Sequence, residues 1–424
     1  MARLIYSLCF LLALPLIWLR LLWRARRQPE YLQHLGERHG RFPRRPDGPL
    51  IWVHAVSVGE TRAAQPLIEG LLRQWPDHHI LLTGMTPTGR ATGLALYGTR
   101  VLQCYLPYDL PFTVDRFFEH FSPACGVLME TEVWPNLLAA ARRHRVPVLL
   151  ANARLSARSA RGYQRFAALA RPAFAALAGV AAQTRADGER LSALGAATVA
   201  VCGNLKFDVA PAAEMLTLGR AWRTTIGARP VWLAASTREG EEALLLAAWR
   251  HQAPAGALLV LVPRHPQRFD EVADLAREVG FRVRRRSQGL PDGDTGVWLG
   301  DSMGEMAAYY AAADLAFIGG SLLPLGGQNL IEAAACGCPV LIGPHTFNFS
   351  QATEDALSAG AARRVEDAEK LGAEVGRLLA APGELAAMRA AAQAFAAAHR
   401  GATARMLALI GRWSGLPDAD RAGR

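Results

Sequence analysis

The sequence predicts an α/β protein with two Rossmann-like domains, and three observations lead to this fold class. The chain has 424 residues, whereas single hydrophobic cores stop growing near about 250–300 residues. Short apolar runs alternate with helical patterns from residue 50 to about residue 202, and the alternation starts again after residue 211. Such alternation is typical of βαβ units around a parallel sheet. An apolar content of 51% excludes global disorder, because it provides ample surface to bury.

The first element is an apolar segment of about twenty residues, Leu4 to Trp23, which matches the thickness of a bilayer's hydrocarbon core. An arginine cluster follows it: Arg24, Arg26 and Arg27. Positive charge on this side keeps the remaining chain in the cytoplasm, and it is the reverse of the pattern of a cleaved signal peptide. We therefore predict an uncleaved membrane anchor over residues 1–28. Pro15 and Arg20 leave two orientations open, a helix that spans the bilayer and a helix that lies in its interface.

The first Rossmann-like domain is expected over residues 29–208. Its apolar runs predict strands near Leu50–Val53, His79–Thr83, Val101–Tyr105, Cys125–Met129, Pro147–Ala151, Gly179–Ala182 and Thr198–Val201. Helical patterns begin between these strands, near Glu60, Thr88, Phe112, Asn136, Ser156 and Ala186.

The second domain is expected over residues 209–414. Its strands are predicted near Val231–Ala235, Ala257–Val262, Arg282–Arg286, Val297–Leu299, Leu315–Ile318 and Pro339–Ile342. The segment from Pro382 is rich in Ala, the best intrinsic helix former, and is expected to be helical and to pack on the body. Residues 415–424 are polar and are expected to form a flexible tail. Two consecutive doubly wound domains place a crevice between the carboxyl edges of their sheets.

The net charge of +10 indicates an anionic partner, which is a nucleic acid, a phosphorylated metabolite or an anionic membrane surface. The predicted anchor favours the membrane. Six cysteines are scattered along the chain, and we expect them to be reduced thiols in the cytoplasm: Cys9, Cys104, Cys125, Cys202, Cys336 and Cys338.

Three polar residues of the first domain are candidates for chemistry. Glu60 ends the stretch His54–Glu60 after the first strand, where open α/β sheets place their ligands, so it is a candidate general base. The alternative is an acid in a first helical turn, where the helix dipole would keep it ionised but make it a weaker base. Glu130 follows another strand, in a stretch that also fits a polar loop with an aromatic lid. Lys206 lies where the chain leaves the domain, although most lysines are simply solvated.

The second domain carries loops suited to a nucleotide. Gly319-Gly320-Ser321 and Gly326–Asn329 lie between a strand and a helix, and Glu332 near the helix start could accept hydrogen bonds from ribose hydroxyls. Arg264 and the Met303-Gly304-Glu305 run follow two other strands. Ordinary strand-to-helix glycines are the alternative interpretation of these loops.

Two further charge patterns fit an ordinary structural role as well as a functional one. Arg154, Arg158, Arg161 and Arg165 lie on or near one helical pattern; they fit a solvated face or, beside a membrane anchor, a phosphorylated lipid. Asp292-Gly293-Asp294 lies in a Gly-rich loop and favours a turn, so no metal is assigned to it.

Motifs over both domains resemble the bacterial 3-deoxy-D-manno-octulosonic acid (Kdo) transferases, which add Kdo to the lipid A precursor. The matching stretches are His54–Glu60, Met85–Gly89, Leu106–Pro111, Glu130–Asn136, Ala151–Ser156, Lys206–Asp208, Val262–Pro266 and Gly343–Phe349, together with the apolar N-terminal segment and Gly36-Glu37-Arg38. The run Glu332–Val340 resembles the nucleotide-sugar signature of glycosyltransferases with two Rossmann-like domains. The chain departs from the common pattern at Gln328, where a His is frequent, and in the Ala-rich Ala333–Cys338 segment.

The resemblance implies a glycosyltransferase-B architecture, in which two Rossmann-like domains face a central cleft. It implies inverting, metal-independent transfer of Kdo from CMP-Kdo to the tetra-acylated disaccharide bisphosphate precursor of lipid A, with no cofactor and no nucleic acid partner. The catalytic domains would lie on the cytoplasmic side of the cell inner membrane. Glu60 would be the general base, and Glu130 and Lys206 would help to stabilise the transition state. The residues implied in CMP binding are Pro263, Arg264, Met303, Gly304, Glu305, Asn329, Leu330, Ile331 and Glu332.

Two other functions remain compatible with the residues. One is a two-domain transferase that uses a UDP-sugar in cell-envelope synthesis. The other is a membrane-bound scaffold that binds a nucleotide without turnover.

Overall fold

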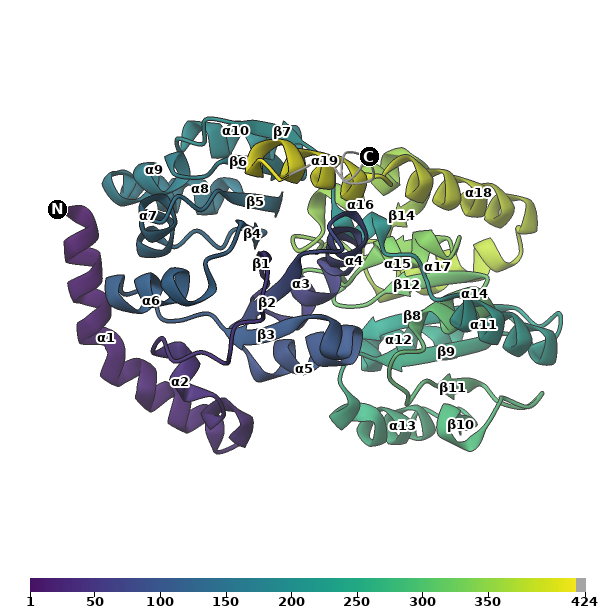
Figure 1. Ribbon diagram of the computed structural model, residues 1–424. Helices are drawn as coiled ribbons and strands as arrows, with labels where there is room; N and C mark the ends of the chain where they lie inside the picture. Colours follow the sequence, from purple (N-terminus) through teal and green to yellow (C-terminus); the bar gives the residue numbers. More distant parts are fainter. Residues whose placement is uncertain (417–424) are drawn as a thin grey trace. The chain divides into compact units, whose positions relative to one another are not determined.

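The computed structural model describes residues 1–416, so the rest of the predicted tail, residues 417–424, lies outside the described residues. The chain forms two compact units (Figure 1). Unit 1 contains Met1–Val209 and the chain from Arg400 onward, and unit 2 contains Ala210–His399. Each unit is built around its own parallel sheet.

Unit 1 has a sheet of seven parallel strands in the order β3-β2-β1-β4-β5-β6-β7. Their bounds are β1 Leu50–His54, β2 His79–Gly84, β3 Leu102–Tyr105, β4 Cys125–Met129, β5 Val148–Ala153, β6 Gly179–Ala182 and β7 Val199–Val201. These strands lie where the sequence predicts them. The strand order reverses between β1 and β4, which pair directly through Ile51–His54 and Cys125–Leu128. Ligands of open α/β sheets bind outside the carboxyl ends of strands at such a switch point.

The helical segments of unit 1 up to residue 208 precede β1, connect the strands or follow β7. They are α1 Ala2–Ala25, η1 Pro29–Leu32, α2 Leu35–Arg38, α3 Val58–Ala63, α4 Gln65–Gln74, α5 Pro87–Tyr97, η2 Gly98–Arg100, α6 Pro111–Phe121, α7 Pro135–Arg143, α8 Ala157–Arg165, α9 Ala167–Ala175, α10 Arg185–Ala193 and η3 Leu205–Asp208. A proline opens α5, α6 and α7, a position where its missing N–H costs nothing.

The sheet of unit 1 separates two hydrophobic cores, because successive side chains of a strand point to opposite faces. Trp52 of β1 packs with Phe117 and Phe118 on one face. Its neighbours Ile51 and Val53 belong to the core on the other face. The fully buried β1 and β4 explain why both read as continuous apolar runs.

Unit 2 has a second sheet of seven parallel strands in the order β10-β11-β9-β8-β12-β13-β14. Their bounds are β8 Val231–Thr237, β9 Leu258–Pro263, β10 Val283–Arg285, β11 Val297–Leu299, β12 Leu315–Ile318, β13 Val340–Ile342 and β14 Ala362–Arg364. The edge strand β14 is the one the sequence does not predict, because two of its three residues are arginines. The helical segments are α11 Ala213–Ile226, α12 Glu241–Gln252, η4 Pro266–Arg268, α13 Phe269–Glu278, η5 Arg286–Gln288, α14 Met306–Ala312, α15 Leu330–Ala335, α16 Ser350–Ser358, α17 Ala368–Leu379 and α18 Pro382–Ala398.

The last helix, α19 Ala402–Ser414, belongs to unit 1, whereas the sequence predicts a second domain that extends to residue 414. Its apolar residues Met406 and Ile410 join the core that contains β1. The Asp208 carboxylate accepts hydrogen bonds from the backbone N–H groups of Gly401 and Thr403, at 2.7 and 2.5 Å. Helical periodicity shows that α19 has an apolar face, but it does not show which sheet that face covers.

Candidate active site

Glu60 is held by the turn that follows β1. Ser57 caps α3, and its hydroxyl oxygen accepts from the Glu60 backbone N–H at 3.4 Å. In return the Glu60 carboxylate accepts from the Val56 N–H at 2.9 Å and from the Ser57 hydroxyl at 3.1 Å. This reciprocal arrangement resembles a capping box. It fixes the orientation of the carboxylate at the β1/β4 switch point.

The pKa of Glu60 is raised to about 7, mainly by burial; the negative charges of Glu130 and Glu132 contribute to the rise, and the hydrogen bonds from the Val56 N–H and the Ser57 hydroxyl oppose it. The expectation that the helix start would make Glu60 a weaker base does not hold, because burial outweighs the hydrogen bonds that this turn donates to the carboxylate. A carboxylate with a pKa near the working pH is suited to accept a proton.

Glu60, Glu130 and Lys206 all belong to unit 1 and lie close enough for their charges to interact. The charge of Glu130 raises the pKa of Glu60, and the charge of Glu60 raises the pKa of Lys206. Glu130 follows β4 with a left-handed backbone, φ 55°, and its N–H donates to the Ala151 carbonyl at 2.9 Å. Lys206 lies in η3. Burial lowers its pKa, while the charges of Glu130 and Glu60 raise it. The structure thus brings the three predicted residues of the first domain together.

Two residues of this site were not singled out from the sequence. Glu132 lies in the loop after β4, accepts from the Trp134 indole N–H at 3.0 Å and has a pKa raised by burial. Asn152, buried at the end of β5 with φ 52°, accepts from the Leu205 N–H at 3.0 Å and so positions η3 beside the site. Asn adopts the left-handed backbone region more readily than most residues, so an Asn near the end of a predicted strand was the available sequence signal for this conformation.

His54, which begins the predicted motif, has a structural role. Its imidazole is fully buried, and burial lowers its pKa to about 4, so it is neutral near pH 7. Its Nδ1 lies 2.9 Å from the Thr83 hydroxyl oxygen and ties β1 to β2.

In unit 2 the strand order reverses between β8 and β12, and a buried carboxylate joins the loops at their ends. Glu241, the first residue of α12, accepts from the backbone N–H groups of Gly320 at 2.6 Å, Arg238 at 2.9 Å and Leu322 at 3.0 Å. Gly319 lies against the Ser236 backbone, where a Cβ would not fit. Sequence reasoning found the glycines but missed Glu241, because an acid at a helix start has a simpler explanation.

The predicted nucleotide residues follow three strands at the carboxyl edge of the unit 2 sheet. Pro263 ends β9, and the N–H of the exposed Arg264 donates to Thr237 at 2.9 Å. The Met303–Glu305 run follows β11; Met303 is exposed, Gly304 has φ 84°, and Glu305 pairs with Arg286 at 3.0 Å.

The third predicted segment follows β12. Asn329 caps α15 by accepting from the Ile331 N–H at 3.2 Å. The side chains of Leu330 and Ile331 are buried in the unit, so they can face a ligand only through their backbone, whereas Glu332 is half-buried.

Asp292-Gly293-Asp294 forms the turn that the sequence favours. The Asp292 carboxylate accepts from the Thr295 hydroxyl at 2.7 Å, and Arg282 pairs with Asp294 at 2.8 Å. Within residues 1–416 no group of three or more His, Cys, Asp or Glu side chains has a metal-binding arrangement. All six cysteines are free thiols.

Comparisons with known proteins agree with this organisation. A family model described as 3-deoxy-D-manno-octulosonic-acid transferase (kdotransferase) matches residues 33–209. The 3-deoxy-D-manno-octulosonic acid transferase of Bordetella pertussis is 48% identical, covering 98% of this chain and 100% of its own length. That of Haemophilus influenzae is 40% identical, covering 83% of this chain and 84% of its own.

A solved glycosyltransferase of Rickettsia africae shares the fold at a TM-score of 0.60 and 13% identity. It covers 88% of this chain and 100% of its own. This likeness confirms the glycosyltransferase-B architecture of two Rossmann-like domains that was predicted from the sequence.

Proposed function

The chain belongs to the 3-deoxy-D-manno-octulosonic acid (Kdo) transferase family, and we propose that it transfers Kdo from CMP-Kdo to the tetra-acylated disaccharide bisphosphate precursor of lipid A. The observation that carries the proposed mechanism is the Glu60 carboxylate. It is oriented by two hydrogen bonds at a switch point and has a pKa of about 7. Such a group is a suitable general base for attack by a sugar hydroxyl.

In the proposed reaction, a hydroxyl oxygen of the acceptor attacks the anomeric carbon of Kdo. Glu60 accepts the hydroxyl proton as the new bond forms, and the bond between that carbon and the CMP phosphate oxygen breaks. Attack opposite to CMP inverts the configuration. Lys206, which interacts with the charges of Glu130 and Glu60, balances the negative charge that develops during transfer, and Glu130 keeps this lysine protonated and in place.

CMP-Kdo is proposed to bind unit 2 at the ends of β9, β11 and β12. The exposed Arg264 supplies a cation for the phosphate, Met303–Glu305 and Asn329–Ile331 supply backbone groups, and Glu332 accepts from ribose hydroxyls. CMP leaves with a single phosphate, which cations and N–H groups can stabilise without a metal ion to bridge a diphosphate.

The arginines on and before α8 are proposed to bind the phosphates of the acceptor. Arg158, Arg161 and Arg165 recur every three or four residues, are exposed and form no ion pair with any described residue. Arg154 precedes them, and its charge lowers the pKa of Lys206, so the row starts near this lysine of the proposed site. Arginine is suited to phosphate because its guanidinium donates two parallel hydrogen bonds.

The acceptor is a lipid, and α1 is the one helix of the described chain that is long and apolar enough to cross a membrane. We propose that the protein is attached to the cytoplasmic side of the inner membrane, where its phosphorylated acceptor and CMP-Kdo meet.

The test is the Glu60→Gln variant with purified CMP-Kdo and the acylated disaccharide acceptor. We expect loss of Kdo transfer with CMP-Kdo binding retained, because the variant loses only the proton acceptor. Glu69→Gln is the matched control, since Glu69 pairs with Arg100 on the surface of the same unit. Normal turnover by Glu60→Gln would refute the role of Glu60.

A donor screen separates the remaining functions. Turnover with UDP-sugars in place of CMP-Kdo would support the alternative transferase, and nucleotide binding without turnover of any donor would support the scaffold. We expect turnover with CMP-Kdo alone.

A further inference from the structure

Helix α1 runs along the edge of unit 1 (Figure 1), and the residues of one of its faces are half-buried or buried along almost its whole length. The shielded residues recur every three or four positions, as expected for one face of a helix. They include Tyr6, Ser7, Phe10, Leu14, Ile17, Trp18, Leu21 and Ala25. Tyr6 to Ala25 spans about 28 Å at 1.5 Å per residue.

The N-terminal half of α1 is attached to unit 1 by polar contacts. The Asn136 side-chain amide donates to the Ser7 hydroxyl at 2.9 Å. The Tyr6 hydroxyl donates to the Asp109 carboxylate, which also accepts from the backbone N–H groups of Asn136 and Leu137 at 3.1 and 2.7 Å. Because Asp109 and Asn136 are buried, this end of α1 is tied to the interior of the unit.

The rest of the inward face makes aromatic and apolar contacts. The Phe10 ring lies 6.1 Å from the Tyr108 ring, and Trp18 stacks on His39 with ring centroids 5.5 Å apart. Leu21 and Ala25 form a small core with Tyr31.

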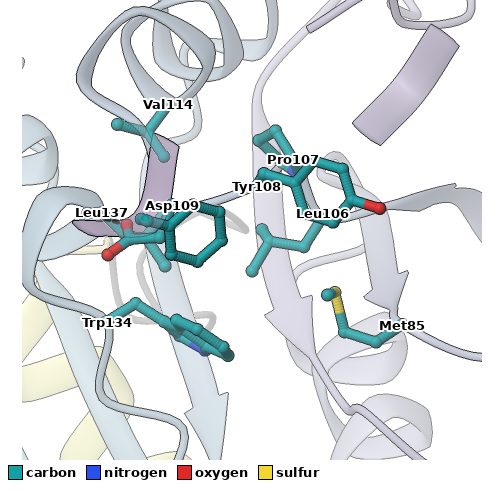
Figure 2. A pocket seen from close by; sticks show the side chains of 9 residues that line it. Met85, Leu106, Pro107, Tyr108, Asp109, Val114, Trp134 and Leu137 are labelled. Carbon is teal, nitrogen blue, oxygen red and sulfur yellow. Dashed lines mark hydrogen bonds between the residues drawn. The ribbon is translucent and has the colours of Figure 1, made fainter. Parts of the chain in front are cut away.

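Phe10 also joins a small, largely apolar pocket of unit 1. Figure 2 shows Met85 and Leu106 on one side of it and Trp134 and Leu137 on the other. Phe10 lines the same pocket, so α1 covers apolar surface that would otherwise be open.

The opposite face of α1 is a continuous apolar surface that no part of residues 1–416 covers. Its large side chains are between 48 and 72% exposed: Leu4, Ile5, Leu8, Leu11, Leu12, Leu16, Leu19, Leu22 and Trp23. The exposed Arg20, Arg24, Arg26 and Arg27 gather at its C-terminal end. Arginines next to an apolar surface are attracted to the headgroups of anionic lipids.

We infer that α1 lies along the surface of an anionic phospholipid bilayer, with its outward face among the acyl chains, and does not cross the bilayer. A spanning helix would have lipid around it through about 30 Å. Here that length is occupied on one side by a folded unit with buried polar groups, which cannot enter the hydrocarbon without a large cost. This inference rests on the proposed membrane attachment and adds the orientation of α1 relative to the bilayer.

Labelling of the full chain in native membranes tests the orientation. In a Cys9→Ser background, Ala2→Cys marks the N-terminus and Ala157→Cys marks the exposed surface of α8. A membrane-impermeant maleimide should label both in inside-out vesicles and neither in spheroplasts, relative to Cys9→Ser alone. Labelling of Ala2→Cys from the outside of spheroplasts would show a spanning helix and overturn the inference. A chain recovered in the soluble fraction would instead contradict membrane attachment itself.

A second measurement tests which face meets lipid. Leu12→Glu should lower binding to phosphatidylglycerol vesicles by about tenfold or more, because it places a charge among acyl chains. Leu94→Glu, at an exposed leucine of α5, should leave binding unchanged. Equal losses in both variants, or a Leu12→Glu variant that binds normally, would overturn the inference. So would a lipid-free dimer that Leu12→Glu dissociates, since a second copy would then cover this face.

Discussion

The substitution Glu60→Gln should stabilise unit 1 at alkaline pH although it abolishes the proposed chemistry. Burial, helped by the charges of Glu130 and Glu132, raises the pKa of Glu60 from 4.5 to about 7 on folding. Between these two values the folded chain binds more protons than the unfolded chain, so the free energy of unfolding falls as the pH rises. The penalty is complete above pH 7 and absent below pH 4.5. A neutral side chain at this position escapes it.

The size of the effect follows from the same pKa. The difference between 4.5 and about 7 corresponds to at most about 3 kcal/mol, since one pKa unit is worth about 1.4 kcal/mol. Glu60 keeps part of its exposure to solvent, which reduces the penalty, so we expect a gain of about 1–3 kcal/mol at pH 8. The Gln carbonyl can still accept the Val56 N–H, and its amide NH2 can donate to the Ser57 hydroxyl oxygen in place of the bond that this hydroxyl donates to Glu60.

Urea unfolding of the full chain, followed by tryptophan fluorescence, measures this difference at pH 8 and pH 5. The gain at pH 8 should shrink to a small fraction at pH 5. Glu69→Gln should behave oppositely, because hydrogen bonding to Arg100 lowers the pKa of Glu69. A Glu60→Gln variant no more stable than the parent at pH 8 would refute the argument from burial.

Three further predictions concern rate and stability. The kcat/KM for Kdo transfer should fall about tenfold per pH unit below pH 6, because Glu60 becomes protonated. Glu132→Gln should move this pH profile to lower pH, because the charge of Glu132 raises the pKa of Glu60. A profile that is flat from pH 5 to 8 would contradict both expectations. Lys206→Met should lower kcat about a hundredfold while calorimetry shows unchanged CMP affinity; a loss confined to affinity would place Lys206 in donor binding. Glu241→Ala should destabilise unit 2 by about 3–5 kcal/mol in urea unfolding, because three backbone N–H groups lose their acceptor; a change below 1 kcal/mol would contradict this.

The sequence predicts the sheets well because parallel strands are buried on both faces and read as apolar runs. β1 and β4 are the clearest cases. Where the signal is not apolar, prediction fails. The edge strand β14 is rich in arginine, and the apolar face of α19 fits either unit equally well by pattern alone.

The sequence predicts where the candidate site residues lie relative to the strands, but not the electrostatic interactions between them. Glu60, Glu130 and Lys206 follow from their places after strands and from the family's motifs. The pKa of Glu60 depends on burial and on Glu130 and Glu132, about seventy residues away in the chain, which only the fold brings near. The role of Glu241 was not predictable for the same reason, because its partners Gly320 and Leu322 lie on a loop that is distant in the chain.

The proposed base and the proposed membrane helix belong to one continuous piece of structure. The loop after β4 carries Glu130 and Glu132 and leads directly into α7. Asn136 lies in the first turn of α7. Its backbone N–H donates to the Asp109 carboxylate, and its side-chain amide donates to the hydroxyl of Ser7 in α1. The proposed membrane helix is therefore attached two residues beyond Trp134, whose indole donates to Glu132. Because the Asn136 contacts are polar and Asn136 is buried, α1 and the loop that carries Glu130 and Glu132 are held in one unit, and the depth at which α1 lay in a bilayer would set the height of Glu60 above the lipid.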